Sequence, residues 1–219
     1  MKAIMYIALV LLIFMFVLSI YYYPQMPEKV PSHWNAKGEI NGYLDPFWGL
    51  FLVPLMSVFV FGLFAIIPKI AVFKANIVAF LKYYYGIVLI LMIFLLSIQL
   101  SIIYAALGNP LQINYVIMPG IAVLFVYLGY SMQFIKRNYF IGIRTPWTLS
   151  SDEVWDKTHQ VGSKLFMLIG LVFLVTLVMP SDYFIWIILG SVFGMVFGAV
   201  GYSYYIWTKL GRPNNGRKK

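Results

Sequence analysis

The chain has no cysteine and few charged residues. Of its 219 residues, 11% are charged, seven are acidic and two are histidines, whereas 62% are hydrophobic. Without cysteine, neither a disulfide nor a thiolate metal site can form. A soluble domain of this length carries about 25% charged residues, and the number found here is too small to cover a water-soluble globule. The composition therefore predicts an integral membrane protein.

Six apolar runs are long enough to cross a bilayer, which takes about 20 residues of helix. They are Ala3–Tyr23, Phe47–Pro68, Tyr84–Leu107, Tyr115–Phe134, Leu165–Met179 and Tyr183–Trp207. The fifth run is short, and we expect its helix to begin near Gly162. No small-residue cleavage site follows the first run, which we interpret as an uncleaved anchor. The predicted fold class is an all-α polytopic membrane protein with six transmembrane helices.

Lysine and arginine are distributed unequally between the loops that join these runs. One side of the membrane receives Lys2, Lys69, Lys74, Lys82, Lys136, Arg137, Arg144, Lys157, Lys164, Lys209, Arg212, Arg217, Lys218 and Lys219, and the other receives Lys29 and Lys37. Because cytoplasmic loops carry the excess of basic residues, we expect both termini to be cytoplasmic at the plasma membrane. We interpret the net charge of +9 as this topology signal and as attraction to anionic lipid, without direct binding to nucleic acid.

The runs themselves contain no Asp, Glu, Lys, Arg or His. This absence disfavours a proton-coupled carrier or pump, which needs an ionisable group at membrane depth. The sixth run has Gly190, Gly194 and Gly198 at four-residue spacing, a pattern that lets two helix backbones approach closely. We expect this stripe to pack within the bundle, with a seam between two chains as the alternative. The sequence leaves the oligomeric state open.

We divide the chain into three parts of one membrane domain. Residues 1–68 form the first helix pair, with an extracytoplasmic cap at 24–46. Residues 69–135 form the third and fourth membrane helices, and residues 136–219 form a polar loop, the last two helices and a basic tail. Three prolines up to Pro31 exclude a long helix in the cap. Lys37-Gly38 and Asn41-Gly42 are typical of turns, so we predict a compact, turn-rich cap.

The polar loop predicts a helix of its own. Pro146 disfavours helix at the residue before it, and Ser150 followed by Glu153 has capping-box spacing. We therefore expect an amphipathic cytoplasmic helix from Ser151, lying on the membrane surface or against the bundle. Trp155 precedes His159 by four residues, so stacking between the two rings explains this histidine without catalysis.

Metal binding and catalysis find little support in these residues. A zinc site needs three or four suitable ligands, and His33 and His159 are expected on opposite sides of the membrane. A cation shared by His33 and nearby carboxylates stays an alternative. No catalytic set is recognisable, so we predict no enzyme, no metal and no cofactor.

Two motifs carry a family resemblance. Asn138-x-x-Ile-Gly-Ile-Arg-Thr-Pro-Trp-Thr-Leu149, followed by Trp155 and His159, resembles the signature of the bacterial SdpI/YfhL family. Pro31-x-His-Trp-Asn-x-x-Gly-x-x-x-Gly-Tyr43, after a first membrane helix, is similar to the small uncharacterised domain that often precedes this signature. Together the two motifs and their spans cover essentially the whole chain.

The resemblance implies a membrane protein that gives immunity to a secreted peptide toxin and holds a transcriptional repressor at the membrane. It implies toxin contacts in the cap, for which the candidates are His33, Trp34, Asn35, Gly38, Asn41, Gly42 and Tyr43. Candidate contacts to the cytoplasmic repressor are Asn138, Gly142, Arg144, Thr145, Pro146, Trp147, Thr148, Trp155 and His159. The alternatives are a membrane enzyme or sensor acting on lipid or cell envelope, and a peptide exporter.

Overall fold

The computed structural model describes residues 2–109, 111–180 and 183–213. Its elements are α1 (Lys2–Tyr22), η1 (Tyr23–Gln25), β1 (Val30–Trp34), β2 (Ile40–Leu44), α2 (Pro46–Ile70), α3 (Lys74–Ala79), α4 (Leu81–Ala106), α5 (Asn114–Met132), α6 (Pro146–Ser150), α7 (Asp152–Val175), η2 (Thr176–Val178) and α8 (Phe184–Lys209). Within these residues, six helices are long and apolar enough to cross a membrane. The predicted fold class is confirmed, and the protein is a multi-pass membrane protein.

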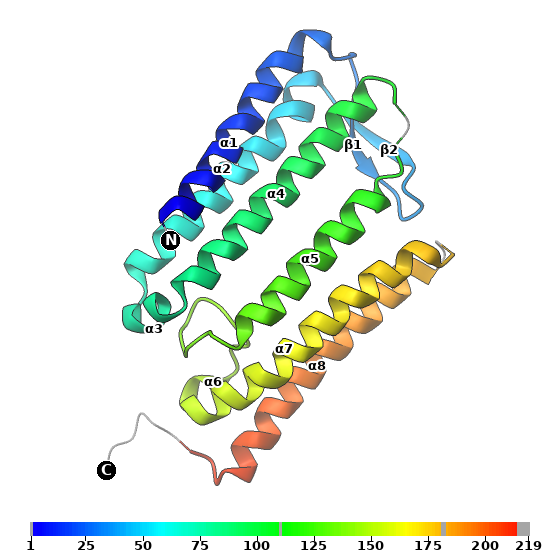
Figure 1. Cartoon of the computed structure of the whole chain (residues 1–219). Coiled ribbons are helices and arrows are strands. Elements are labelled where there is room, and N and C mark those ends of the chain that lie inside the picture. The colour runs from blue at the N-terminus through cyan, green and yellow to red at the C-terminus, as the bar shows by residue number, and fades with distance from the viewer. Residues whose placement is uncertain (1, 110, 181–182, 214–219) are drawn as a thin grey trace.

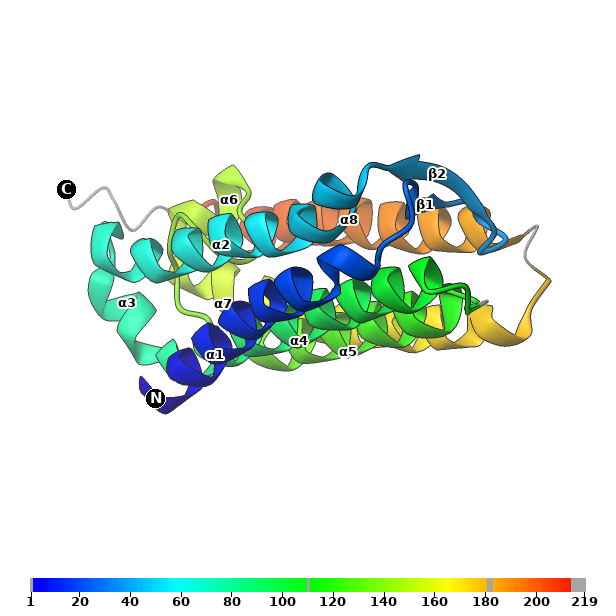
Figure 2. The same ribbon diagram turned by 90° about the horizontal axis from the view of Figure 1, so that it is seen from above.

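The six long helices run roughly alongside one another (Figure 1). The most extensive contacts join α5 to α7, α7 to α8, and α1 to α4, while α4 also packs against α2 and α5. Seen from above, α2 and α8 lie on one side of the layer formed by α1, α4, α5 and α7 (Figure 2). The two strands also lie on that side.

The two ends of the bundle carry different structures (Figure 1). At one end, which we call the hairpin end, β1 and β2 cover the ends of the helices. At the other, the motif end, lie α3, α6, the start of α1 and the last turn of α8. Arg217, Lys218 and Lys219, which contribute to the charge asymmetry, lie outside the described residues.

Two prolines inside α2 determine how this helix is tied to its neighbours. Pro54 and Pro68 have no backbone N–H, which frees the carbonyls of Leu50 and Phe64 four residues earlier. The Leu50 carbonyl accepts from Ser19 Oγ and Gln99 Nε2, each at 2.9 Å. The Phe64 carbonyl accepts from the hydroxyl of Tyr84 at 2.7 Å. Polar side chains of α1 and α4 thus bind the groups that the prolines release.

The cap contains an antiparallel hairpin that the sequence did not predict. Its turn is at Lys37-Gly38, as expected, with Gly38 at φ +78°. The turn predicted at Asn41-Gly42 is wrong, because both residues lie in β2. A Cβ at Gly42 would lie 2.8 Å from the Cβ of His33 across the strands. Gly42 therefore allows the two strands to approach each other closely at an irregular point in their register. It does not form a turn.

The glycine stripe of α8 has no neighbour among the described residues. A Cβ built at Gly190, Gly194 or Gly198 meets no atom within 4 Å. The packing expected within the bundle is thus not seen in the described part of the chain. A seam with a second chain stays a prediction.

Candidate functional site

The motif end begins with a tight loop organised by Asn138. The side-chain oxygen of Asn138 accepts from the backbone N–H groups of Phe140 and Ile141, both at 2.8 Å. Its amide nitrogen donates to the carbonyls of Lys136 (2.9 Å) and Ile141 (3.0 Å). The side chain is buried, and an amide that bonds its own backbone in this way is a common device for holding a turn.

Trp155 and His159 join this loop to α7. The fully buried Trp155 donates from Nε1 to the carbonyl of Ile135 at 2.8 Å. The two rings stack with centroids 4.0 Å apart, which confirms the expected i, i+4 contact. His159 Nδ1 lies 2.8 Å from the Trp155 carbonyl, and Nε2 lies 3.0 Å from the backbone nitrogen of Ile143.

These contacts define the state of the imidazole of His159. The N–H of Ile143 can only donate, so Nε2 is the acceptor and Nδ1 carries the proton. Both ring nitrogens are occupied by backbone groups. In this arrangement His159 is a neutral structural residue with no nitrogen left for a metal or a substrate.

Gly142 lies beside this ring pair. It adopts φ +115°, a conformation that side chains rarely adopt. A Cβ built there would overlap Nε2 of His159 and lie 3.1 Å from the Trp155 ring. The motif therefore needs glycine at this position for both conformation and space.

The threonines and proline of the motif form α6, a short helix that the sequence did not predict. Thr145 is its N-cap, with Pro146 in the first turn, and the side chains of Thr145 and Thr148 make reciprocal capping bonds. Thr148 Oγ1 also donates to the Ile143 carbonyl at 2.8 Å. Thr145 Oγ1 lies 3.1 Å from Ser203 Oγ, which connects the loop to α8.

The start of α7 differs from the prediction. The capping box predicted at Ser150 and Glu153 is wrong, because Ser150 ends α6 and donates to the Trp147 carbonyl. The N-cap is Ser151, whose side chain accepts from Val154 N. From there α7 runs unbroken, so the amphipathic stretch and the fifth membrane span are one helix. No proline interrupts it, and Gly162 faces Ile143 without breaking it.

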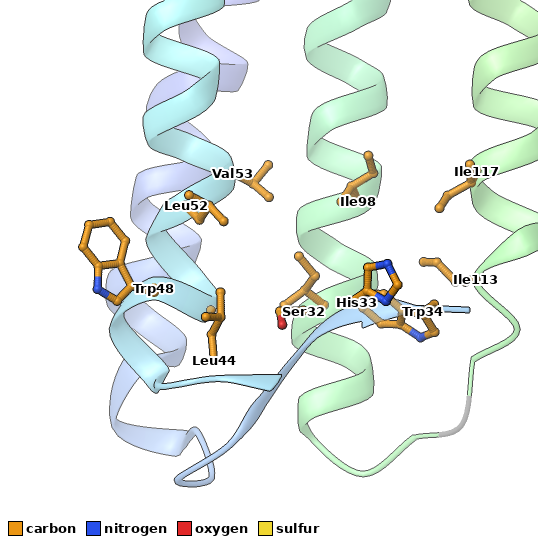
Figure 3. Close-up of a pocket in the computed structure, with 12 residues that line it drawn as sticks. Ser32, His33, Trp34, Leu44, Trp48, Leu52, Val53, Ile98, Ile113 and Ile117 are labelled. Atoms are coloured by element: carbon orange, nitrogen blue, oxygen red, sulfur yellow. The ribbon is translucent and has the colours of Figure 1, made fainter. Parts of the chain in front are cut away.

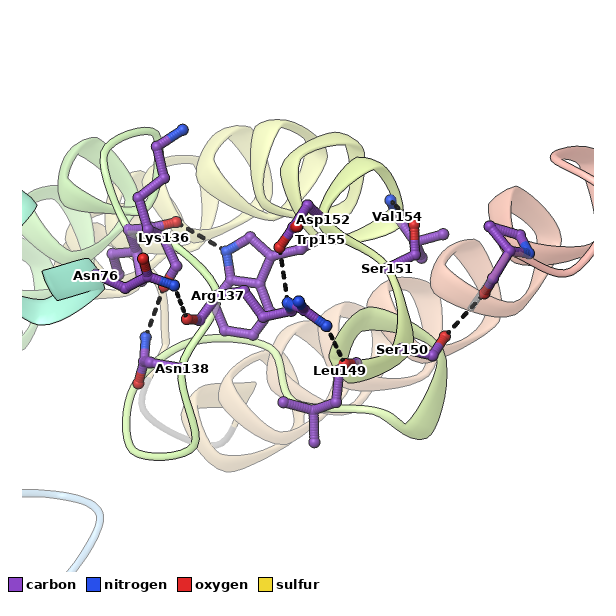
Figure 4. A network of polar contacts seen from close by, with 12 residues as sticks. Asn76, Lys136, Arg137, Asn138, Leu149, Ser150, Ser151, Asp152, Val154 and Trp155 are labelled. Atoms are coloured by element: carbon purple, nitrogen blue, oxygen red, sulfur yellow. Dashed lines mark hydrogen bonds and ion pairs between the residues drawn. The ribbon is translucent and has the colours of Figure 1, made fainter. Parts of the chain in front are cut away.

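Arg137 has a structural role that the sequence did not reveal (Figure 4). Its Nε lies 2.7 Å from Asp152 Oδ1, and its Nη1 donates to the Leu149 carbonyl at 2.7 Å. Its own carbonyl accepts from Asn76 of α3 at 2.6 Å. The residue thus joins α3, α6 and the start of α7. The sequence offered only a Lys-Arg pair after an apolar run as a signal.

Arg144, one of the candidate contacts to the repressor, is exposed. Its Nη1 donates to the carbonyl of Tyr139 within the same loop. The exposed side chain can still meet a partner.

The hairpin end is held by side-chain amides. Asn35 Oδ1 accepts from the N–H groups of Lys37 (2.9 Å) and Glu39 (3.1 Å), which forms the turn. Asn114 at the start of α5 donates to the Ala36 carbonyl at 3.1 Å. His33 Nδ1 lies 2.6 Å from Asn41 Oδ1. No group of three His, Cys, Asp or Glu able to hold a metal occurs in the described part of the chain.

Beneath the hairpin, a cavity of about 280 Å³ opens between α2, α4 and α5 (Figure 3). Ser32, His33 and Trp34 of β1 lie at its hairpin side, and most of the remaining wall consists of aliphatic side chains. Leu44 at the end of β2 and Trp48 in the first turn of α2 also border it. The cap is therefore hollow on its inner side.

Comparison with known proteins finds one family match in each half of the chain. Residues 135–203 match the SdpI/YfhL protein family, and residues 10–58 match a domain of unknown function (DUF1648). Over 204 residues the chain is 26% identical to the immunity protein SdpI of Bacillus subtilis (strain 168), covering 93% of this chain and 96% of that protein. The chain is thus similar to the SdpI/YfhL family over residues 135–203 and to this immunity protein over nearly its whole length. No solved structure matches it significantly.

The SdpI/YfhL match coincides with the hydrogen-bonded unit at the motif end. It begins at Ile135, whose carbonyl binds Trp155, and ends at Ser203, whose hydroxyl contacts Thr145. The DUF1648 match includes Ser19 and Leu50, two members of the contact around the carbonyl released by Pro54. Both matched regions thus contain contacts that tie one helix to another.

The nine predicted repressor contacts of the SdpI/YfhL motif differ in how far they are buried. Asn138, Thr145, Thr148, Trp155 and His159 are buried, whereas Arg144 and Pro146 are exposed and Gly142 and Trp147 are half-buried. Trp147 packs on Tyr204 of α8 with ring centroids 5.1 Å apart. In this conformation, only the exposed and half-buried residues can contact a soluble protein directly. The buried residues hold them in place.

Proposed function

We propose that this protein is a plasma-membrane immunity protein that protects its cell from a secreted, membrane-active peptide toxin. The observation that carries the proposal is the similarity, over nearly the whole chain, to a protein named for immunity. The lack of an ionisable side chain in the apolar runs supports protection by binding rather than by coupled export.

The hairpin end is the proposed contact for the toxin. The uneven distribution of basic residues favours an extracytoplasmic hairpin and a cytoplasmic motif end. Tyr43 and His33 are exposed on the strands, and Asn35 and Gly38 shape the turn beside them. The remaining predicted contacts are Trp34, Asn41 and Gly42. A peptide lying at the membrane surface would meet this part of the protein first.

The motif end is the proposed docking place for a cytoplasmic repressor. Arg144, Pro146 and Trp147 would form the contact surface, and the buried motif residues would position it. The basic residues of this end would also attract anionic lipid. A toxin can shift the exposure of such a surface only if it binds one arrangement of the bundle more tightly than another.

Protection is tested by survival of cells. We expect a toxin-sensitive strain without its own immunity protein to grow in the presence of the purified toxin when it expresses this chain. The same strain with an empty vector should lose viability by orders of magnitude. Immunoblots of membrane fractions verify that the protein is present. Equal killing of both strains would refute the immunity assignment.

Recruitment is tested with Arg144→Ala. This exposed residue makes one bond to its own loop, so we expect membrane levels and survival to stay unchanged. We expect the fraction of a fluorescent repressor found at the membrane after toxin addition to fall at least fivefold. Lys157→Ala, at a half-buried basic residue of the same end that pairs with Glu153, is the control. Normal recruitment by Arg144→Ala would exclude this residue from the contact.

A further inference from the structure

The cavity beneath the hairpin has walls suited to a hydrocarbon chain. Its aliphatic lining includes Leu52 and Val53 of α2, Ile98 and Ile102 of α4, and Ile117 of α5. These residues belong to three of the membrane-length helices, at the end that the hairpin covers. With about 280 Å³, the cavity exceeds the roughly 150 Å³ that accommodates benzene in a protein core. It therefore has room for several methylene groups beside the bilayer.

Trp34, which borders this cavity, carries a buried polar atom that lacks a partner. Its indole Nε1 is buried and has no acceptor among the described residues. The indole N–H can only donate, and a buried donor without an acceptor is costly. An acceptor from outside the described chain would complete this bond.

A second hollow also borders this tryptophan. It measures about 330 Å³ and shares His33 and Trp34 with the first cavity. Asn35 and Asn114 provide polar groups around it, while Met118 and Ile188 of α5 and α8 provide apolar ones. Both hollows are partly apolar, and both border Trp34, whose indole N–H is unpaired.

We infer that the hairpin end binds one diacyl phospholipid from the adjoining leaflet. One acyl chain occupies the cavity between α2, α4 and α5, and the other occupies the hollow between α5 and α8. An ester carbonyl of the glycerol backbone accepts the hydrogen bond from Trp34 Nε1. Tryptophan is enriched at the membrane interface, where these carbonyls lie, and the bilayer supplies phospholipid at high local concentration.

Native mass spectrometry of the whole protein tests this site. The protein is purified in mild detergent, incubated with phosphatidylethanolamine and stripped stepwise of loosely bound lipid. We expect the unmodified chain to retain one phospholipid. Ile98→Trp, which fills the first cavity, should retain at least tenfold less, and Ile117→Phe provides a milder filling of the same wall. Ile93→Trp, on the exposed face of α4 outside both hollows, should retain the lipid normally.

The hydrogen bond is tested separately with Trp34→Phe, which keeps an aromatic ring but removes the donor. We expect retention to fall about three- to tenfold, the range for one net hydrogen bond, whereas Trp186→Phe on exposed α8 surface should have no effect. A dialkyl ether phospholipid lacks the ester carbonyls and should bind the unmodified chain as weakly as the ester lipid binds Trp34→Phe. Failure of the unmodified chain to retain a lipid would overturn the inference. Normal retention by both cavity-filling variants would overturn it as well.

Discussion

Replacing Gly142 with alanine is expected to destabilise the protein by about 3 to 5 kcal/mol, from backbone strain together with a lost buried hydrogen bond. The loop passes Gly142 at φ +115°. A methyl group there would overlap Nε2 of His159. Relief of this overlap would separate His159 from the N–H of Ile143 and disturb its stack on Trp155. The motif end would then lose its central contact.

Gly108→Ala is a matched control for this prediction. Gly108 also has a positive φ, +85°, but a Cβ there meets no described atom within 4 Å. It should therefore show only the strain component, about 1 to 2 kcal/mol. Thermal unfolding in detergent, followed by tryptophan fluorescence, compares the two variants. Equal stability of both would contradict the packing described around His159.

Tyr84→Phe is expected to cost about 1 to 3 kcal/mol, because it leaves a buried carbonyl without its donor. The Phe64 carbonyl is free of a helical partner since Pro68 has no N–H, and the Tyr84 hydroxyl is the donor it receives. Pro68→Ala restores a backbone N–H four residues after Phe64. We therefore expect Pro68→Ala to stabilise the Tyr84→Phe variant more than it stabilises the unmodified chain.

A double-mutant cycle measures this coupling directly. Tyr127→Phe is the control, because its hydroxyl makes a longer bond of 3.4 Å to a carbonyl within a regular turn of α4. Its removal should change stability little. If the two substitutions at 68 and 84 were additive, Tyr84 would not compensate for the proline.

The lengths of the apolar runs were sufficient to predict the six membrane helices, because each helix must be long enough to span the same hydrocarbon core. The partners of the proline-released carbonyls could not be predicted in this way. Gln99 lies 49 residues from Leu50, and Tyr84 lies 20 residues from Phe64. Such contacts depend on which helices become neighbours, and hydropathy does not contain that information.

The local structure at the two ends was predictable only in part. The i, i+4 spacing of Trp155 and His159 indicated their stacking, because residues at that spacing share one face of a helix. Asn41-Gly42 indicated a turn, but Asn35, six residues earlier, forms the hairpin turn through its own side chain. Thr145 and Thr148 form a capping box in which threonine takes the place of the usual glutamate. The sequence pattern therefore did not predict α6.

The account depends most on the two ends of the bundle facing opposite sides of the membrane. The chain has no cysteine, so a single cysteine reports its position without background. The measurement is labelling of Lys37→Cys and Asp156→Cys, at exposed positions of the hairpin and motif ends, by a membrane-impermeant maleimide. We predict that Lys37→Cys is labelled on intact cells and Asp156→Cys only after permeabilisation. Labelling of both on intact cells, or the reverse pattern, would contradict the proposal that the hairpin meets a secreted toxin while the motif faces the cytoplasm.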